Sequence, residues 1–288
     1  MIPSRVWQLV WRLQVTTTIS IRFKLLTTVA FIICGLPALG AEHALLVKQA
    51  YQSNSPWPMY SESTDSAYTQ QKLFIHSMDE EIIGYKAGIT SPGSQERFNL
   101  SEPVSGVLLG SMRSGSEVDT AEFRRMMLEV ELGFYLTRKV TEPVQRISQI
   151  SELILRIVPV VELPDLGFED PANLGGPSII ASNVSARRFI VGEFTRQPDD
   201  LNQIEVQLSH DGSVIMQDVA GGVLGDQRRA LIWLVNTVLS HGYRVLPGHL
   251  LITGAIGQMV PGQMGHYDVS FSELGQLSFV IVDSGEMR

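Results

Sequence analysis

The sequence predicts an α+β protein, because strand patterns are scattered along the chain with few helices between them. Two apolar runs, 127–136 and 157–162, have the alternating or β-branched composition of strands. The segment 226–241 has the apolar spacing of a helix, with Asp226 as its cap and Gly242 as its stop. Together these patterns favour an α+β fold over a doubly wound parallel sheet.

The first half of the chain holds both helix and strand patterns. Helices are expected at 41–51, 65–78 and 92–100, and strands at 81–88 and 104–109. Ser91 is a good N-cap for the third of these helices. Residues 52–63, which are rich in Ser and Pro, form a loop between the first two helices.

The second half of the chain is richer in strands. Besides the two apolar runs, strands are expected at 204–208, 214–219, 250–253, 267–271 and 277–282. The first two of these form a hairpin about the turn sequence His210–Ser213. A helical turn is expected at 144–150 and a loop at 164–177, whereas the segment 178–190 fits a helix and a strand equally well.

The first forty residues have the layout of a secretory signal peptide. They carry four basic residues and no acidic one, and an apolar run at 25–36 leads to small residues around Gly40. That run is well short of the roughly 20 residues needed to cross a bilayer, so an uncleaved anchor is the minor alternative. We therefore expect a signal peptide at 1–40 and an exported, periplasmic mature protein.

Cysteine content and charge exclude several classes of function. Cys34, the only cysteine, lies in the expected signal peptide, so the mature chain has no disulfide framework, Cys-ligated zinc or cysteine nucleophile. Removal of four basic residues would change the net charge from −8 to −8 − 4 = −12. Such an acidic chain is a poor candidate for binding nucleic acid or a membrane surface, and we expect neither as a partner.

Glu129 and Glu131 are the most informative pair in the strand expected at 127–136. Residues two apart share one face of a strand, so both glutamates lie opposite the face of Val130 and Leu132. Two carboxylates roughly 7 Å apart repel each other unless something neutralises them, and a hard cation such as Mg²⁺ would do so. The simpler interpretation is a strand with one face in water.

Glu162 is a third candidate metal ligand, because it ends an apolar strand where an unpaired carboxylate would be costly. With Glu129 and Glu131 it could form an octahedral site for one divalent ion, completed by water or substrate oxygens. A salt bridge to a nearby arginine is an equally good explanation of Glu162.

Two glycine-containing segments are further candidates for a binding site. Lys86 lies between Gly84 and Gly88, and glycine lets the backbone approach a ligand closely. Lys86 could bind a substrate carboxylate or transfer protons, or it could be a solvated surface lysine. The turn at Thr253–Gly254 could hold a small anion through backbone N–H groups, or it could be a tight turn only.

Four segments resemble, in order, the motifs of one known family. They are 84–92 (GYKAGITSP), 129–131 (EVE), 161–165 (VELPD) and 251–261 (LITGAIGQMVP). The family is the 2-keto-4-pentenoate hydratase and 4-oxalocrotonate decarboxylase group of the fumarylacetoacetate hydrolase superfamily. The resemblance extends from about Ser55 to the C-terminus.

The resemblance implies a fumarylacetoacetate hydrolase-like mixed β-roll with a helical N-terminal part. It also implies Mg²⁺ (or Mn²⁺) on Glu129, Glu131 and Glu162, with Lys86 as a proton shuttle. The substrate would be a small 2-hydroxy-dienoate or 2-keto-enoate acid such as 2-keto-4-pentenoate, and the protein a homo-oligomer. The expected organisation is a helical region at 41–80 followed by a metal-binding catalytic domain at 81–288.

The chain departs from the family's pattern at two places. The family usually has an acidic or aromatic pair where this chain has Val104-Ser105, and often Asp-Asn where it has Ser182-Asn183. Both segments are expected near the substrate. The candidate substrate-binding residues are therefore Ser182, Asn183, Thr253 and Gly254.

A hydratase is the leading hypothesis for the reaction, because three ordered glutamates accompany Lys86. The alternatives are a decarboxylase of a 2-oxo-dicarboxylic acid and an exported protein that binds keto acids or a metal without catalysis. A C–C hydrolase of acylpyruvates ranks below the decarboxylase, since no convincing lid motif is visible near the N-terminus.

Overall fold

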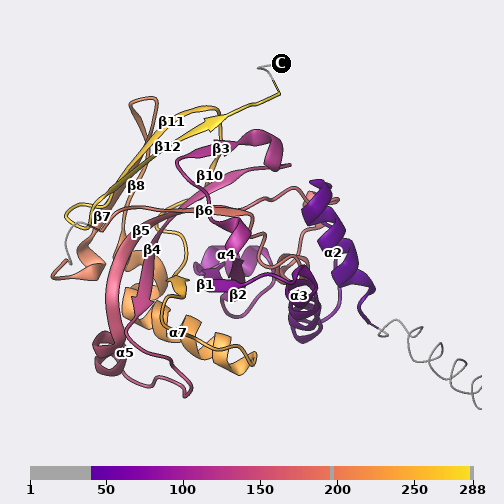
Figure 1. Cartoon of the computed structure of the whole chain (residues 1–288), viewed down its shortest axis with the longest axis horizontal. Helices are drawn as coiled ribbons and strands as arrows, with labels where there is room; N and C mark the ends of the chain where they lie inside the picture. The colour runs from indigo at the N-terminus through magenta and orange to yellow at the C-terminus, as the bar shows by residue number, and fades with distance from the viewer. Residues whose placement is uncertain (1–39, 195–197, 286–288) are drawn as a thin grey trace, which may run out of the picture. The chain divides into compact units, whose positions relative to one another are not determined.

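The computed structural model describes residues 40–194 and 198–285 (Figure 1), so the signal peptide expected at 1–40 lies outside the described residues apart from Gly40. The residues from His43 onward belong to one compact unit. Among the helices of the described part, none has both the length and the apolar character needed to span a membrane.

The described residues form two β-sheets (Figure 1). The larger sheet has the strand order β2 (Val104–Leu109), β1 (Ile82–Gly88), β9 (Leu250–Ile252), β4 (Met127–Leu136), β5 (Ile154–Leu163) and β6 (Arg188–Val191), with β10 (Val260–Pro261) also paired to β4. The smaller sheet has the order β3 (Glu117–Asp119), β12 (Gln276–Val282), β11 (Gly265–Ser270), β7 (Glu205–His210) and β8 (Ser213–Val219). Each sheet mixes antiparallel pairs with one parallel pair, which confirms the α+β class.

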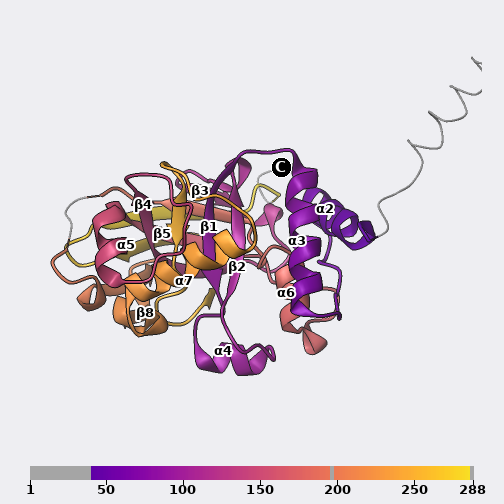
Figure 2. The same ribbon diagram turned by 90° about the horizontal axis from the view of Figure 1, so that it is seen from below.

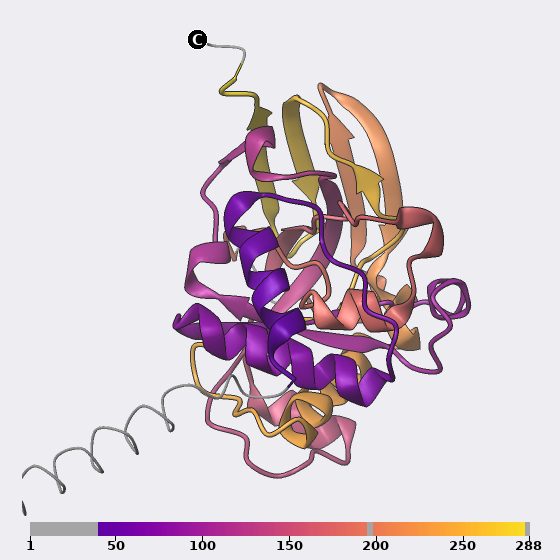
Figure 3. The same cartoon turned by 90° about the vertical axis from the view of Figure 1, so that its right-hand side faces the viewer.

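Helices cover the larger sheet and extend beside it. They are α2 (Glu42–Ser53), α3 (Thr64–Met78), α4 (Pro92–Arg97), α5 (Ile147–Leu153), α6 (Gly176–Ala181) and α7 (Gln227–Ser240). Helix α7 lies across β1 and β2 (Figure 2), and α3 packs beside α6 (Figure 3).

The helix ends follow from local chemistry, as the sequence indicates. The side chains of Ser91 and Asp226 accept hydrogen bonds from the backbone N–H groups of Ser94 and Arg229, which caps α4 and α7. Gly242, which follows α7, has a φ of +79°, a conformation that glycine adopts without strain. Three expectations are thus confirmed at these termini.

Several elements differ from the expected ones. Helix α4 ends at Arg97 rather than at residue 100, and the short strands β3 and β10 were not expected. The helix expected at 144–150 lies at 147–153 instead, and its C-cap is Ile154, the first residue of β5. The ambiguous segment 178–190 divides into the end of α6, a left-handed turn at 183–185 and the strand β6. No single periodicity fits this segment because it contains three conformations.

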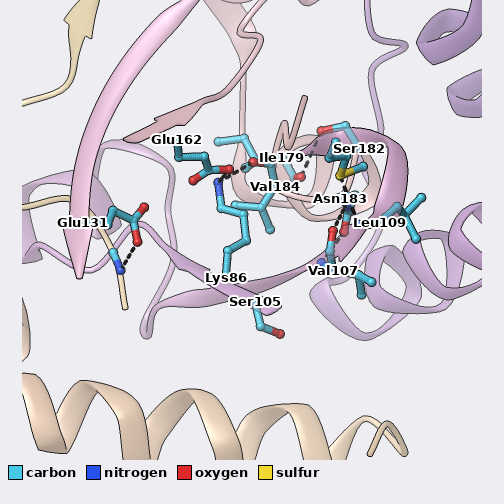
Figure 4. Close-up of polar contacts among 12 residues, drawn as sticks. Lys86, Ser105, Val107, Leu109, Glu131, Glu162, Ile179, Ser182, Asn183 and Val184 are labelled. Atoms are coloured by element: carbon cyan, nitrogen blue, oxygen red, sulfur yellow. Dashed lines mark hydrogen bonds and ion pairs between the residues drawn. The ribbon is translucent and has the colours of Figure 1, made fainter. Parts of the chain in front are cut away.

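Strand β1 separates two environments. Tyr85 faces the segment after α7, where its hydroxyl donates a hydrogen bond to the Arg244 carbonyl oxygen at 2.9 Å. The next residue, Lys86, faces the opposite side of the sheet, as alternation along a strand requires. Figure 4 shows Lys86 pointing toward Glu162 while Ser105, from the neighbouring strand, points away. The candidate site therefore lies on the face of β1 opposite α7.

Candidate metal centre

Strands β4 and β5 bring the three glutamates together. Glu129 and Glu162 are direct partners across this antiparallel pair, and Glu131 is two residues further along β4. One carboxylate oxygen of each glutamate lies within 4.8 Å of those of the other two. Glu131 and Glu162 are fully buried and Glu129 is half-buried. The interpretation of β4 as a strand with one face in water is therefore wrong for Glu131.

Two buried carboxylate oxygens in this cluster accept no hydrogen bond from the described residues: Oε1 of Glu131 and Oε2 of Glu162. Their partner oxygens are engaged, because Glu131 Oε2 accepts from the Gly254 N–H at 2.6 Å and Glu162 Oε1 binds Lys86 Nζ at 2.5 Å. Buried oxygens without a partner are costly unless a cation binds them.

Burial raises the pKa of the Glu131 carboxyl well above its usual range, and the charges of Glu162 and Glu129 raise it further. Burial also raises the pKa of Glu162 to about 7, although the charge of Lys86 acts in the opposite direction. Three ionised carboxylates this close repel one another, so ionisation of all three is unfavourable unless a positive charge lies among them. The all-oxygen donor set is the one that Mg²⁺ and Mn²⁺ prefer, so the residues fit such an ion.

Lys86 is buried beside the cluster, with 1% of its surface exposed. Its Nζ donates to Glu162 Oε1 and, at 3.2 Å, to the Val184 carbonyl oxygen (Figure 4). Burial acts to lower the pKa of Lys86, but the charges of Glu162, Glu129 and Glu131 outweigh it and raise that pKa. A solvated surface lysine is therefore the wrong interpretation, and the cation beside Glu162 is this lysine rather than an arginine.

The four candidate substrate-binding residues are all buried, and their polar groups bond within the protein. The Ser182 hydroxyl donates to the Ile179 carbonyl oxygen at 3.0 Å, and the Thr253 hydroxyl donates to Gln227 Oε1 at 2.7 Å. The side chain of Asn183 and the N–H of Gly254 are engaged as well. A direct role of these residues toward a substrate stays a prediction.

Gly254 holds Glu131 in place and cannot be replaced without strain. Its φ is +107°, and an added Cβ would lie 2.5 Å from Thr90 Cγ2. Gly254→Ala is expected to weaken binding of Mn²⁺ by about 10- to 100-fold, the usual cost of losing a residue that orients a metal ligand. Calorimetric titration of the purified variant with Mn²⁺ measures this effect.

Gly248→Ala is the matched control for this prediction, because Gly248 has a φ of +89° and no atom within 4 Å of an added Cβ. It carries the backbone strain without the collision, so it should leave Mn²⁺ binding unchanged. Equal weakening in both variants would contradict the assigned role of Gly254.

Asp165 is a residue whose structural role the sequence did not reveal. Its carboxylate accepts hydrogen bonds from the N–H groups of Arg124, Arg125 and Gly167 at 3.1, 2.7 and 3.0 Å. These bonds tie the end of β5 to the segment that leads into β4, next to the glutamates. The only sequence signal was that Asp165 follows Glu162 within one motif.

Asp165→Ala is expected to lower the free energy of unfolding by about 3 kcal/mol or more, because several N–H groups lose a buried anionic acceptor. Urea denaturation measures the change. Asp170→Ala serves as control, since the Asp170 carboxylate accepts a hydrogen bond from the exposed Asn173 side chain, and a loss below about 0.5 kcal/mol is expected there. Similar losses in both variants would contradict the role of Asp165.

Comparison with known proteins agrees with this architecture. No protein-family model matches the chain. It is 27% identical over 233 residues to 2-oxo-hept-4-ene-1,7-dioate hydratase from Escherichia coli. The aligned region covers 76% of this chain and 87% of that protein. It is 25% identical over 241 residues to 2-keto-4-pentenoate hydratase from Paraburkholderia xenovorans, covering 80% and 89% respectively.

Two solved structures show the same fold. 4-Oxalocrotonate decarboxylase from Pseudomonas putida G7, complexed with magnesium and adipate, superposes with a TM-score of 0.78 at 22% identity, over 85% of this chain and 97% of that one. A fumarylacetoacetate hydrolase family protein from Yersinia pestis superposes with a TM-score of 0.54 at 13% identity, over 71% and 94%.

The fold is that of the fumarylacetoacetate hydrolase superfamily, with a mixed α+β body and helices at its N-terminal side, as the sequence predicted. By sequence, the chain is a distant homologue of the 2-keto-4-pentenoate hydratases and 4-oxalocrotonate decarboxylases. The family resemblance stated from the four motifs is thereby confirmed.

Proposed function

We propose that the protein is a divalent-metal-dependent hydratase, a lyase that acts on a small 2-hydroxy-dienoate or 2-keto-enoate acid such as 2-keto-4-pentenoate. One observation carries the proposal: three glutamates converge beside a buried lysine, and two of their buried oxygens accept no hydrogen bond from the part of the chain that the structure describes. Relatives that are hydratases and decarboxylases support the class of reaction.

Glu129, Glu131 and Glu162 would hold Mg²⁺ or Mn²⁺. When bound, such an ion supplies Lewis-acid polarisation of the substrate's keto oxygen. Gly254 keeps Glu131 in position through its N–H, and the half-buried Glu129 marks the side of the cluster that is open to solvent.

Lys86 would hold and transfer the proton in this site. Its ammonium is beside Glu162, and the side chains of Val104 and Val184 lie near the Lys86 stem around Gly88. Only 1% of the surface of Lys86 is exposed, so solvent has little access to it. A proton held at Nζ could pass to a carbon of the conjugated chain and return after the reaction.

A decarboxylase of a 2-oxo-dicarboxylic acid is the second candidate. Addition of water needs a group that activates the water, whereas loss of CO₂ does not. This chain has no ionisable side chain at Val104 or Ser182, and the Ser182 hydroxyl is already bonded to Ile179. That observation favours decarboxylation as the alternative.

The direct test is turnover of 2-hydroxypenta-2,4-dienoate and of 4-oxalocrotonate with Mg²⁺. Water addition to the first supports the hydratase, and CO₂ release from the second supports the decarboxylase. Lys86→Ala should lower the rate of either by at least about 100-fold. Tight binding of either acid without any product would instead support a non-catalytic binding protein.

Export and homo-oligomerisation are further proposals. The layout of residues 1–40 supports cleavage near Gly40 and a periplasmic protein. The mass of the mature protein and light scattering test these two proposals. A chain that keeps its first forty residues, or a monomer at all concentrations, would contradict them.

A further inference from the structure

The turn Asn183–Ser185 has an unusual backbone. Its three residues have φ values of +60°, +54° and +57°, the left-handed region that residues other than glycine rarely adopt. Val184 is β-branched, for which this conformation is a genuine outlier. Hydrogen bonds within and around the turn hold it, including Val184 N–H to the Ile179 carbonyl oxygen at 2.8 Å and Asp165 N–H to the Ser185 carbonyl oxygen at 2.9 Å. Strained residues of this kind concentrate at functional sites.

The strained turn directs one carbonyl oxygen at the buried lysine. Lys86 Nζ donates to Val184 at 3.2 Å and to Glu162 at 2.5 Å (Figure 4). An ammonium group has three N–H groups. With two of them fixed by acceptors on opposite segments, the ammonium cannot rotate freely, and its third N–H has a set direction.

Asn183 attaches this turn to the sheet. Its side chain accepts a hydrogen bond from the Val107 N–H at 2.7 Å and donates one to the Val107 carbonyl oxygen at 2.8 Å, and it is fully buried. Val107 lies on β2 next to Gly106, which pairs with Lys86 across β1 and β2. Asn183 therefore connects the turn to the strand beside the lysine.

The absence of side chains at Gly106 and Gly88 provides the space in which Lys86 and the turn pack together. A Cβ at Gly106 would lie 3.0 Å from the Asn183 carbonyl oxygen and 3.0 Å from Lys86 Cγ. A Cβ at Gly88 would lie 2.6 Å from Val184 Cγ1. The lysine stem and the turn thus fit closely against both strands, and a small shift of the turn would move the carbonyl away from Nζ.

We propose that Asn183 is a positioning residue: it holds the left-handed turn against β2, aims the Val184 carbonyl at Lys86, and so fixes the direction in which the lysine presents its free N–H. This inference rests on the proposed function, in which Lys86 transfers a proton. It also assigns Asn183 a different role from direct substrate binding, since both ends of its amide are bonded to Val107.

The chain contains a matched control for this role. The side chain of Asn236, on α7, makes the same pair of bonds to one valine, accepting from the Val144 N–H at 2.8 Å and donating to the Val144 carbonyl oxygen at 2.9 Å. Asn236→Ala and Asn183→Gly each remove such a pair with a residue that suits the local backbone. Glycine is used at 183 because it tolerates the positive φ.

In the holoenzyme with Mn²⁺, Asn183→Gly is expected to lower kcat by about 10- to 100-fold, as a small misplacement of a catalytic group does. KM and the affinity for Mn²⁺ should stay within about threefold, because the three glutamates and the Gly254 N–H that holds Glu131 are untouched by the substitution. Asn236→Ala should leave kcat unchanged. An unchanged kcat in Asn183→Gly, or an equal loss in both variants, would overturn the inference.

A second readout does not depend on activity. The ¹⁵Nζ resonance of the buried Lys86, assigned by its absence in Lys86→Met, should shift or broaden in Asn183→Gly and stay in place in Asn236→Ala. An unmoved resonance in Asn183→Gly would also overturn the inference. Should Asn183→Gly not fold, Asn183→Asp replaces it, because aspartate tolerates the positive φ and keeps the acceptor for the Val107 N–H. A moved resonance in an enzyme that turns over neither dienoate nor 4-oxalocrotonate would refute the proposed function while leaving the role of Asn183 supported.

Discussion

Replacing Glu131 by glutamine is expected to stabilise the metal-free protein and to abolish tight binding of Mg²⁺ or Mn²⁺. Glu131 is fully buried, and its raised pKa reflects the cost of that burial together with the nearby charges of Glu162 and Glu129. A neutral amide of nearly the same shape removes this cost and can still accept the hydrogen bond of the Gly254 N–H. It also removes one of three anionic ligands.

Two measurements test this prediction. Urea denaturation in the presence of a chelator should show a gain on the order of 1 kcal/mol in the free energy of unfolding. Calorimetry should show that Mn²⁺ binding weakens by more than the roughly 10- to 100-fold typical of a lost orienting residue. Glu205→Gln, at an exposed position that begins β7, is the control and should change neither quantity. Tight Mn²⁺ binding by Glu131→Gln would contradict the metal centre.

The metal-free protein should lose stability as the pH rises from about 5 to about 8. Burial raises the pKa of Glu162 from 4.5 to about 7 and raises that of Glu131 in the same direction. Above 4.5 the unfolded chain releases these protons while the folded chain still holds them. The folded state then binds more protons than the unfolded state, so its stability falls through this pH window. The loss should be on the order of 1 kcal/mol or more.

Three half-buried histidines act in the opposite direction over part of this window. Burial lowers the pKa values of His43, His241 and His249, so their contribution to stability grows as the pH rises. Comparison with Glu131→Gln separates the two effects, because that variant keeps all three histidines. Between about pH 5 and about pH 8 in chelator, the free energy of unfolding should fall more for the wild type than for Glu131→Gln. Saturating Mg²⁺ should reduce this difference between the two proteins. Parallel pH profiles of wild type and variant in chelator would contradict the prediction.

Most secondary structure could be predicted from local patterns. The ends of α4 and α7 depend on Ser91, Asp226 and Gly242, which act on backbone groups within a few residues. The hairpin of β7 and β8 turns at the expected place because its turn residues select it. The segment 178–190 could not be assigned, since its turn is held by Ile179, Val107 and Asp165 against its own backbone preferences.

The candidate site was predictable in its residue types but not in its contacts. Alternation along β4 already placed Glu129 and Glu131 on one face. That Glu162 lies opposite Glu129 depends on the register of β4 with β5, which a single strand pattern does not contain. The proposed positioning role of Asn183 and the structural role of Asp165 could not be predicted from the sequence either, because their hydrogen bonds join segments distant in the chain.

The amino-acid sequence by itself determined the α+β class, the order of most strands and helices, and the three glutamates and one lysine that form the candidate centre. Tertiary structure alone decided that Lys86 is buried, that its partner is Glu162, 76 residues away, and that a strained turn supplies its second acceptor. The physical reason is the separation along the chain over which each interaction acts. Periodicity and capping act between neighbours along the chain, whereas burial and charge depend on segments that only folding brings together.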